Sequence, residues 1–373
     1  MSGSMSMVLS DAAVVADHSA ASGKRSFTSI PVVNISGLYS ADLSERLAVA
    51  GQLAQAARDV GFIYIEGHSI PHSRMDALLL AAQQFFAQPL ATKLNSYIGY
   101  SRNHSGYVPE GEEQFYAPSG AAAMVDRKES WDCGFELEDP RYCRPMLGQN
   151  QWPELPGFRQ AVMAYYNEAL ALGRILFRGF ALALGLPETF FDGALQAPPS
   201  QLRLVHYPYD GDASDRVGIG AHTDYECFTL LLPTADGLEV LNGDGQWIDA
   251  PVIPGCLVVN IGDMLEVLSN GRFVATSHRV RKVAQERYSF PLFCSLDYDT
   301  CVAPVLPPLP GTSPERYQPL ICGDHLYAQT IRTFRYLRQK VAAGELGMPD
   351  QARELASFGQ YRAVLDLAAG ESL

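Results

Sequence analysis

A histidine and an aspartate two positions apart, His222 and Asp224, are the first candidates for chemistry in this sequence. They lie in or beside a predicted β-strand, where side chains repeat with a period of two, so both leave the same face and can bind one metal ion. Such a pair alone is a weak signal, because any two polar residues at a strand end fit it. A third candidate, His278, lies 54 residues after Asp224, on a strand that a folded sheet can place beside the first.

Two imidazoles and one carboxylate favour iron(II) as the metal. They fill about half of an octahedral shell and leave adjacent positions open, which is typical of non-haem iron(II) sites that activate oxygen. Zinc usually takes more nitrogen or sulfur ligands and leaves fewer positions open. The remaining histidines lack this spacing, and we expect them not to bind the metal: His18, His68, His72, His104, His206 and His325.

Arg287 and Ser289 form a second pair at positions i and i+2, beginning nine residues after His278. On a strand, both side chains would face the same side. A guanidinium is a planar fork of donors that matches a carboxylate, and a serine hydroxyl can add a further hydrogen bond. The pair could therefore hold a carboxylate near the metal. The alternative is a surface arginine paired with an acidic neighbour.

The ordered set of His222, Asp224, His278, Arg287 and Ser289 resembles the signature of the isopenicillin N synthase-like branch of the iron(II)- and 2-oxoglutarate-dependent dioxygenases. The resemblance covers roughly residues 28 to 340. The other runs that carry it are residues 30–33, 59–62, 67–71, 220–224, 229–232, 237–240, 245–248, 254–263, 269–271 and 276–280.

This resemblance implies a mixed α/β fold with a mainly β core, a double-stranded β-helix or distorted jelly roll with flanking helices. It implies that iron(II) is held by His222, Asp224 and His278. The reaction would use O2, with ascorbate as a stimulant, and would hydroxylate, desaturate or cyclise a small organic substrate while releasing succinate and CO2. The sequence identifies neither the substrate nor which of these outcomes occurs.

The resemblance also implies how the co-substrate 2-oxoglutarate is bound. Arg287 and Ser289 would hold its distal carboxylate, and Tyr207 matches a family tyrosine that approaches the co-substrate. The family often has asparagine two residues before this tyrosine. Val205 occupies that position here, which removes one expected contact.

Candidate substrate contacts come from the loop region and from neighbours of the metal strands. Ordinary packing is the alternative for each of them. They are Arg102, Tyr107, Phe115, Tyr209, Tyr225, Cys227 and Phe293.

Two other functions remain open. An oxidase resembling isopenicillin N synthase itself would use iron and O2 without 2-oxoglutarate, and it would hold a substrate carboxylate with the same Arg-x-Ser pair. A non-catalytic metal-binding or sensing protein could retain the barrel. That alternative predicts a missing ligand or anchor, and none is missing from the motif.

Composition favours a cytoplasmic enzyme that acts on small molecules. A net charge of -13 disfavours nucleic acid and anionic membrane surfaces, since binding to both depends on clustered Lys and Arg. No run approaches the roughly 18 apolar residues that span a bilayer. The seven cysteines are scattered, odd in number and without a C-x-x-C pair, which fits a reducing compartment. We expect a monomer, and the family resemblance implies a role in secondary metabolism.

Periodicity predicts the elements that must position these residues. A strand, a helix and a strand are expected over residues 30–65, a helix over 73–86 before Pro89, and long loops with short strands over 94–156. The apolar spacing of residues 158–184 predicts a scaffold helix. Many short strands over 201–298 predict the jelly roll, and a final helix is expected over 323–343.

The chain is therefore expected to divide into four regions. Residues 1–26 form a disordered tail, and 27–156 form an N-terminal dioxygenase region with helices and substrate loops. Residues 157–345 form the jelly-roll catalytic core with its scaffold helix, and 346–373 form a C-terminal helical extension.

Overall fold

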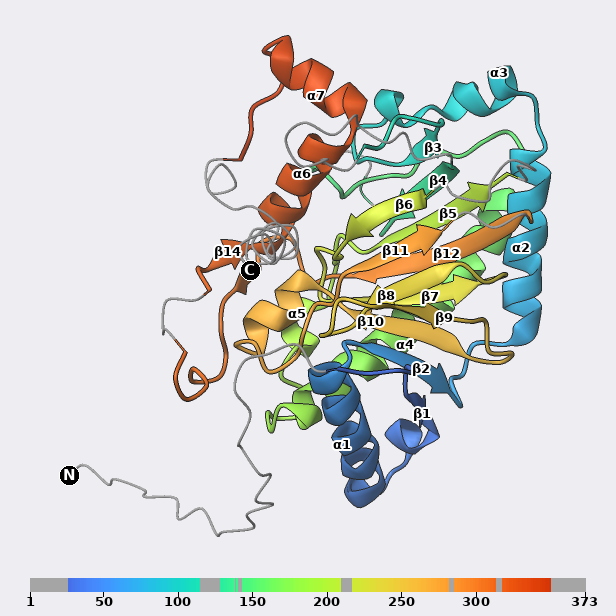
Figure 1. Ribbon diagram of the computed structural model, residues 1–373. Helices are drawn as coiled ribbons and strands as arrows, with labels where there is room; N and C mark the ends of the chain where they lie inside the picture. Colours follow the sequence, from blue (N-terminus) through green and yellow to red (C-terminus); the bar gives the residue numbers. More distant parts are fainter. Residues whose placement is uncertain are drawn as a thin grey trace.

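Two β-sheets form the core of the molecule and enclose a cavity lined by residues of both. The computed structural model describes residues 26–114, 128–137, 139, 143–208, 217–281, 285–312 and 317–349. The expected N-terminal tail and C-terminal extension lie almost entirely outside the described residues. The fold class expected from the sequence, a mainly β jelly roll with flanking helices, is confirmed (Figure 1).

The larger sheet has eight strands, and all neighbours pair antiparallel except β1 and β2. Its runs of Val, Ile, Leu and Phe are buried on both faces, because the smaller sheet covers one face and helices cover the other. In spatial order the strands are β1 (Val32–Asn34), β2 (Phe62–Glu66), β10 (Leu257–Ile261), β7 (Phe228–Pro233), β12 (Arg287–Cys294), β5 (Gln201–Tyr207), β4 (Glu129–Gly134) and β3 (Gly106–Val108).

The smaller sheet has four antiparallel strands, in the order β6 (Val217–His222), β11 (His278–Arg281), β8 (Leu238–Leu241) and β9 (Trp247–Ala250). Its β6 and β11 carry the two metal-ligand histidines expected from the sequence. A separate two-stranded ribbon is formed by β13 (Cys301–Val302) and β14 (Leu320–Ile321).

Helices cover the outside of the larger sheet. The expected scaffold helix is α4 (Phe158–Ala183), which runs behind the sheet in Figure 1 and buries one apolar face against it. It also packs against α1 (Leu43–Asp59) and α2 (His72–Phe86). The shorter helices are α3 (Leu90–Lys93), α5 (Asp263–Leu268), α6 (Cys322–Thr333) and α7 (Arg335–Ala342), with 3-10 turns η1 (Ser36–Tyr39), η2 (Leu94–Ser96), η3 (Ile98–Tyr100) and η4 (Asp192–Ala194).

The prediction of one continuous helix over residues 323–343 is wrong. The structure has two helices, α6 and α7, with Phe334 between them in an extended conformation (φ -97°, ψ 126°). The break arises because residues 112–114 run alongside and hydrogen-bond to the chain there. Gln114 N donates to Thr333 O (2.8 Å), and Arg335 N donates to Glu112 O (2.9 Å). A distant backbone partner thus replaces helical hydrogen bonds that periodicity alone would predict.

Within the described residues, no helix is both long and apolar enough to cross a membrane.

Gly61 links α1 to β2 and packs against Val274 and Thr276, in the segment that leads into His278. Its φ is +74°, and its N–H donates to Ala56 O (3.0 Å) at the end of the helix. A Cβ at this position would lie 2.3 Å from Val274 O, closer than any real contact. The position therefore requires glycine both for its left-handed backbone and for the close approach of residue 274.

We predict that Gly61→Ala lowers the free energy of unfolding by more than about 1 kcal/mol, because the new methyl must displace backbone and the left-handed conformation disfavours alanine. Urea denaturation measures this. The matched control is Gly51→Ala in exposed α1, where a Cβ meets nothing within 4 Å. That variant should gain about 0.4–1 kcal/mol from helix propensity. Equal stability of the two variants would contradict the close packing at Gly61.

Candidate active site

The two sheets bring His222, Asp224 and His278 together. His222 ends β6 and pairs in register with His278, the first residue of β11, while Asp224 lies two residues beyond β6 in the connection to β7. Asp224 Oδ1 is 3.7 Å from Nε2 of each histidine. One ligand atom from each of the three residues lies within 4.8 Å of the others. Atoms bound about 2 Å from a shared ion have separations of this order.

Both imidazoles are oriented by hydrogen bonds to the backbone. His222 Nδ1 lies 2.8 Å from Gly220 O, and His278 Nδ1 lies 3.2 Å from Thr276 O. A proton on each Nδ1 satisfies these carbonyls and leaves Nε2 with a free lone pair. Burial and the neighbouring charge of His278 lower the pKa of His222 to about 4, so its imidazole is neutral and ready to bind a metal near pH 7.

The Asp224 carboxylate is oriented by two donors from the larger sheet. Asn260 Nδ2 on β10 donates to Oδ2 (2.7 Å), and Thr229 on β7 donates its hydroxyl to the same oxygen. Oδ1 is left to face the two histidines. Burial raises the pKa of Asp224, but attraction to both imidazoles and these hydrogen bonds outweigh it and hold the pKa below its ordinary value. The carboxylate is therefore ionised.

These donors fit iron(II). Two imidazoles and one ionised carboxylate meet at the wall of a cavity, so the remaining positions around an ion would open into that cavity. The apolar side chains around the ligands restrict water at the site, including Phe62, Ile219, Leu231, Leu238 and Val280.

Arg287 and Ser289 line the same cavity, as do Pro291 and Phe293, at alternate positions of β12. Arg287 is 1% exposed. Its Nε donates to Ala235 O (3.1 Å) and its Nη1 to Ser289 Oγ (3.4 Å). Among the described residues, no carboxylate pairs with this guanidinium. A buried cation without a counter-ion is costly, so the arrangement fits an anionic ligand such as a 2-oxoglutarate carboxylate.

Tyr207 and Val205 lie on β5, directly opposite this pair. Tyr207 is in register with Arg287, and its ring centroid lies 4.7 Å from the guanidinium carbon. Val205 is opposite Ser289 and 2% exposed. It packs in a small apolar cluster with Tyr207 and Val280. At this position the chain therefore presents methyl groups to the part of the cavity that Arg287 and Ser289 line, in place of the asparagine expected from the family resemblance.

The structure separates the seven candidate substrate contacts. Tyr225 and Phe293 line the cavity. Tyr107 and Cys227 are buried in the main hydrophobic core and are not among the cavity residues, and Tyr107 donates its hydroxyl to Glu129 (2.6 Å). Arg102 is exposed and away from the cavity. Phe115 and Tyr209 lie outside the described residues.

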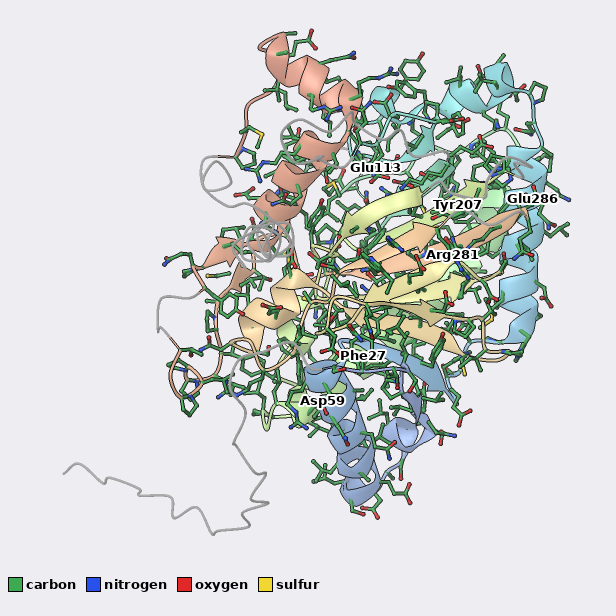
Figure 2. The ribbon with its side chains drawn as sticks, in the orientation of Figure 1. Phe27, Asp59, Glu113, Tyr207, Arg281 and Glu286 are labelled. Carbon is green, nitrogen blue, oxygen red and sulfur yellow. The ribbon has the colours of Figure 1, made fainter. Side chains whose placement is uncertain are left out.

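Sequence patterns did not reveal several polar residues that support or line the site. Asn260 is the single polar residue of the apolar strand β10, a signal that could have marked it. Thr229 gives no such signal. Glu113, Arg203 and Glu226 also line the cavity, and Glu113 and Tyr207 are labelled in Figure 2.

Comparison with known proteins settles the family. The model of the 2OG-Fe(II) oxygenase superfamily matches residues 198–296, and the model described as non-haem dioxygenase in morphine synthesis N-terminal matches residues 30–155. A homoarginine-6-hydroxylase of Oryza sativa subsp. japonica is 34% identical over 328 residues, covering 83% of this chain and 98% of that protein. The chain belongs to the iron(II)- and 2-oxoglutarate-dependent oxygenases.

Other proteins that are similar to this oxygenase support the same family assignment. A 2-oxoglutarate-Fe(II) type oxidoreductase of Metarhizium rileyi is 35% identical over 71% of the chain and 76% of its own length. A full-length Neurospora crassa protein, solved in complex with alpha-KG, superposes with a TM-score of 0.69 at 27% identity, covering 84% of this chain and 96% of that one. A Caulobacter crescentus 2OG-Fe(II) oxygenase family protein gives 0.69 at 32% identity, covering 85% and 99%.

The expected enzyme class and cofactors are thereby confirmed. The protein is an oxidoreductase of the isopenicillin N synthase-like superfamily that uses iron(II) and 2-oxoglutarate. This finding favours 2-oxoglutarate dependence over the oxidase and the non-catalytic alternatives.

We predict that Thr229→Val and Asn260→Ala each weaken iron(II) binding by about 10–100-fold, because Asp224 Oδ2 loses a donor and the carboxylate can rotate. Anaerobic calorimetric titration with iron(II) measures the affinity. Thr229→Ser retains the hydroxyl and is the control, which should bind iron(II) like the wild type. Unchanged affinity in Thr229→Val would show that this hydrogen bond does not orient the ligand.

Proposed function

We propose that this oxygenase hydroxylates an aliphatic C–H bond of a small molecule bound beside His222, Asp224 and His278. These three residues hold iron(II), and Arg287 with Ser289 holds the distal carboxylate of 2-oxoglutarate. The observation that carries the proposal is the buried guanidinium of Arg287, which has no carboxylate partner among the described residues and shares a cavity with the three ligands.

The proposed hydroxylation accounts for both atoms of O2 and for the four electrons that reduce it. One atom of O2 enters the substrate and converts C–H to C–OH. The other enters 2-oxoglutarate, which loses CO2 and becomes succinate. Substrate and co-substrate each supply two of the four electrons that reduce O2. Bound iron(II) supplies the oxygen activation, while the protein positions the reactants and excludes water.

The chain's own residues explain this positioning. Arg287 and Ser289 lie near one end of β12, and Phe293 lies near its other end, where it pairs in register with Thr229, a support of the metal-ligand carboxylate. A ligand anchored at Arg287 would therefore extend along the strand toward the metal ligands. We assign Tyr207 to the co-substrate, because its ring packs against the Arg287 guanidinium. We assign Tyr225 and Phe293 to the substrate, because they line the same cavity beside Asp224 and Thr229.

The names of relatives support hydroxylation over desaturation or ring closure. Proteins of Oryza sativa, Arabidopsis thaliana and Glycine max that are 31–35% identical to this chain are named homoarginine-6-hydroxylases. The similar Neurospora crassa protein has been crystallised with thymine, a small nitrogen-containing ring, which supports a small polar substrate here.

We further propose a cytoplasmic, monomeric enzyme of secondary metabolism without nucleic-acid or membrane partners. The net charge of -13 supports the absence of polyanionic partners. The seven cysteines support a reducing compartment, because all of them are free thiols.

We predict that Arg287→Gln weakens 2-oxoglutarate binding by about 30-fold or more, since removing one partner of a buried charge pair costs about 2–5 kcal/mol. Anaerobic iron(II) protein titrated with 2-oxoglutarate should develop a weak visible charge-transfer band, and its midpoint gives the affinity. Succinate release measures turnover of the same samples.

Arg279→Gln is the matched control. Arg279 lies on β11 of the same barrel but pairs with Glu239 (2.7 Å) and packs over Trp247, away from the cavity. Its replacement should leave the 2-oxoglutarate midpoint unchanged. A wild-type protein that binds iron(II) but gives neither the band nor succinate would argue against the proposal and favour the oxidase chemistry.

A further inference from the structure

We call the part of the cavity that Tyr225 and Phe293 line, away from Arg287, its substrate side. This side contains two cationic side chains, Arg203 and Lys128, and both are already paired. Arg203 on β5 donates through Nη1 to both oxygens of Glu113 (2.8 and 3.0 Å) and through Nε and Nη2 to Asp132 (3.0 and 2.9 Å). Lys128 Nζ lies 2.6 Å from Glu113 Oε2. Arg203 is therefore saturated by two carboxylates, and Lys128 shares one of them.

The side chains that form these ion pairs are buried. The side chains of Lys128 and Glu113 are 6% and 7% exposed, and that of Asp132 is 1% exposed. The rings of Phe293 and Phe334 flank the Arg203 guanidinium, each with its centroid 5.6 Å away. An anionic substrate would have to displace one of these carboxylates from Arg203, leaving a buried charge unpaired, which is strongly unfavourable.

Glu226 is the remaining acidic residue on this side of the cavity. It lies in the connection between β6 and β7, two residues after Asp224, and lines the cavity. Its main chain is fixed, since its carbonyl accepts a hydrogen bond from Met264 N (3.1 Å). Among the residues that the structure describes, no Lys, Arg or His side chain forms an ion pair with its carboxylate.

The charges on the substrate side therefore do not balance. Two cations, Arg203 and Lys128, face three carboxyl groups, those of Glu113, Asp132 and Glu226, and Glu226 is the one left without a cation. The co-substrate cannot supply the missing cation, because 2-oxoglutarate is itself an anion. A carboxyl group that lines the cavity without a cationic partner is matched best by a cationic group of the ligand.

We propose that Glu226 is a specificity-determining residue that binds a cationic nitrogen of the substrate, an amine or a guanidinium. This inference rests on the proposed function and names the substrate class of the same site. The aromatic rings of Tyr225, Phe293 and Phe334 line the cavity with Glu226 and add faces on which a cation can pack. Since Glu226 is two residues from Asp224, the cationic group lies on the part of the substrate close to the metal.

Matched ligands test the proposal. Homoarginine carries a guanidinium, and N6-carbamoyl-lysine replaces it with an uncharged urea of nearly the same shape. Agmatine is a second guanidinium probe, and N-carbamoylputrescine is its counterpart, in which an uncharged urea replaces the guanidinium and the terminal amine is kept. Each is titrated by calorimetry into anaerobic wild-type protein loaded with iron(II) and 2-oxoglutarate. We expect at least one guanidinium probe to bind about tenfold or more tightly than its urea counterpart.

Two variants assign this preference to Glu226. Glu226→Gln should reduce the preference to about twofold or less, because the amide keeps the shape and removes the charge, while Glu226→Asp should retain most of it. Glu188→Gln, which alters a surface partner of Arg46, is the control and should bind like the wild type. The charge-transfer band with 2-oxoglutarate should be unchanged in all three variants, which shows that they are folded and loaded.

The proposal is overturned if no guanidinium probe binds the wild type more tightly than its urea counterpart, or if Glu226→Gln keeps the preference. Tighter binding of N6-carbamoyl-lysine, the urea probe that carries a carboxylate, to Glu226→Gln than to wild type, without any preference for a guanidinium, would instead indicate an anionic substrate and overturn the proposal. Failure of the proposed function is distinguishable, because it appears as a missing 2-oxoglutarate band in the wild type before any probe is added.

Discussion

One carboxylate oxygen determines where the metal can bind. Asp224 Oδ1 lies 3.7 Å from both imidazole nitrogens because its other oxygen is held by Asn260 and Thr229. The two histidines belong to the smaller sheet, and the two supporting residues belong to the larger one. The proposed metal centre therefore depends on the relative placement of the two sheets, and any movement between them would change the geometry of the three ligands.

Side chains alternate along the barrel strands, so one set packs in the hydrophobic core and the other set lines the cavity. On β5 and β12, every second residue enters the cavity, and the residues between them pack toward the helices that cover the outer face. The cavity-facing residues are Gln201, Arg203, Val205, Tyr207, Arg287, Ser289, Pro291 and Phe293. The proposed co-substrate anchor, Arg287 with Ser289, and the saturated Arg203 thus lie on two paired strands, and the register of β5 and β12 sets the distance between them.

Short-range patterns predicted the parts of the site that are close in sequence. The spacing of His222 and Asp224, and that of Arg287 and Ser289, follows from strand geometry alone, and the apolar period of α4 is equally local. The ion pairs of Arg203 were not predictable, because Asp132 and Glu113 precede it by 71 and 90 residues. The break at Phe334 was missed for the same reason, since its cause is a backbone partner near residue 113. Loop candidates such as Tyr107 could not be distinguished from core residues without knowing which face of β3 is buried.

Anomalous scattering at the iron edge, from crystals grown anaerobically with iron(II) and 2-oxoglutarate, tests the central claim most directly. The account predicts one strong peak at bonding distance from Nε2 of His222, Oδ1 of Asp224 and Nε2 of His278, with the distal carboxylate of 2-oxoglutarate on Arg287. A peak that lacks any one of these three ligands, or that lies elsewhere in the molecule, would contradict it.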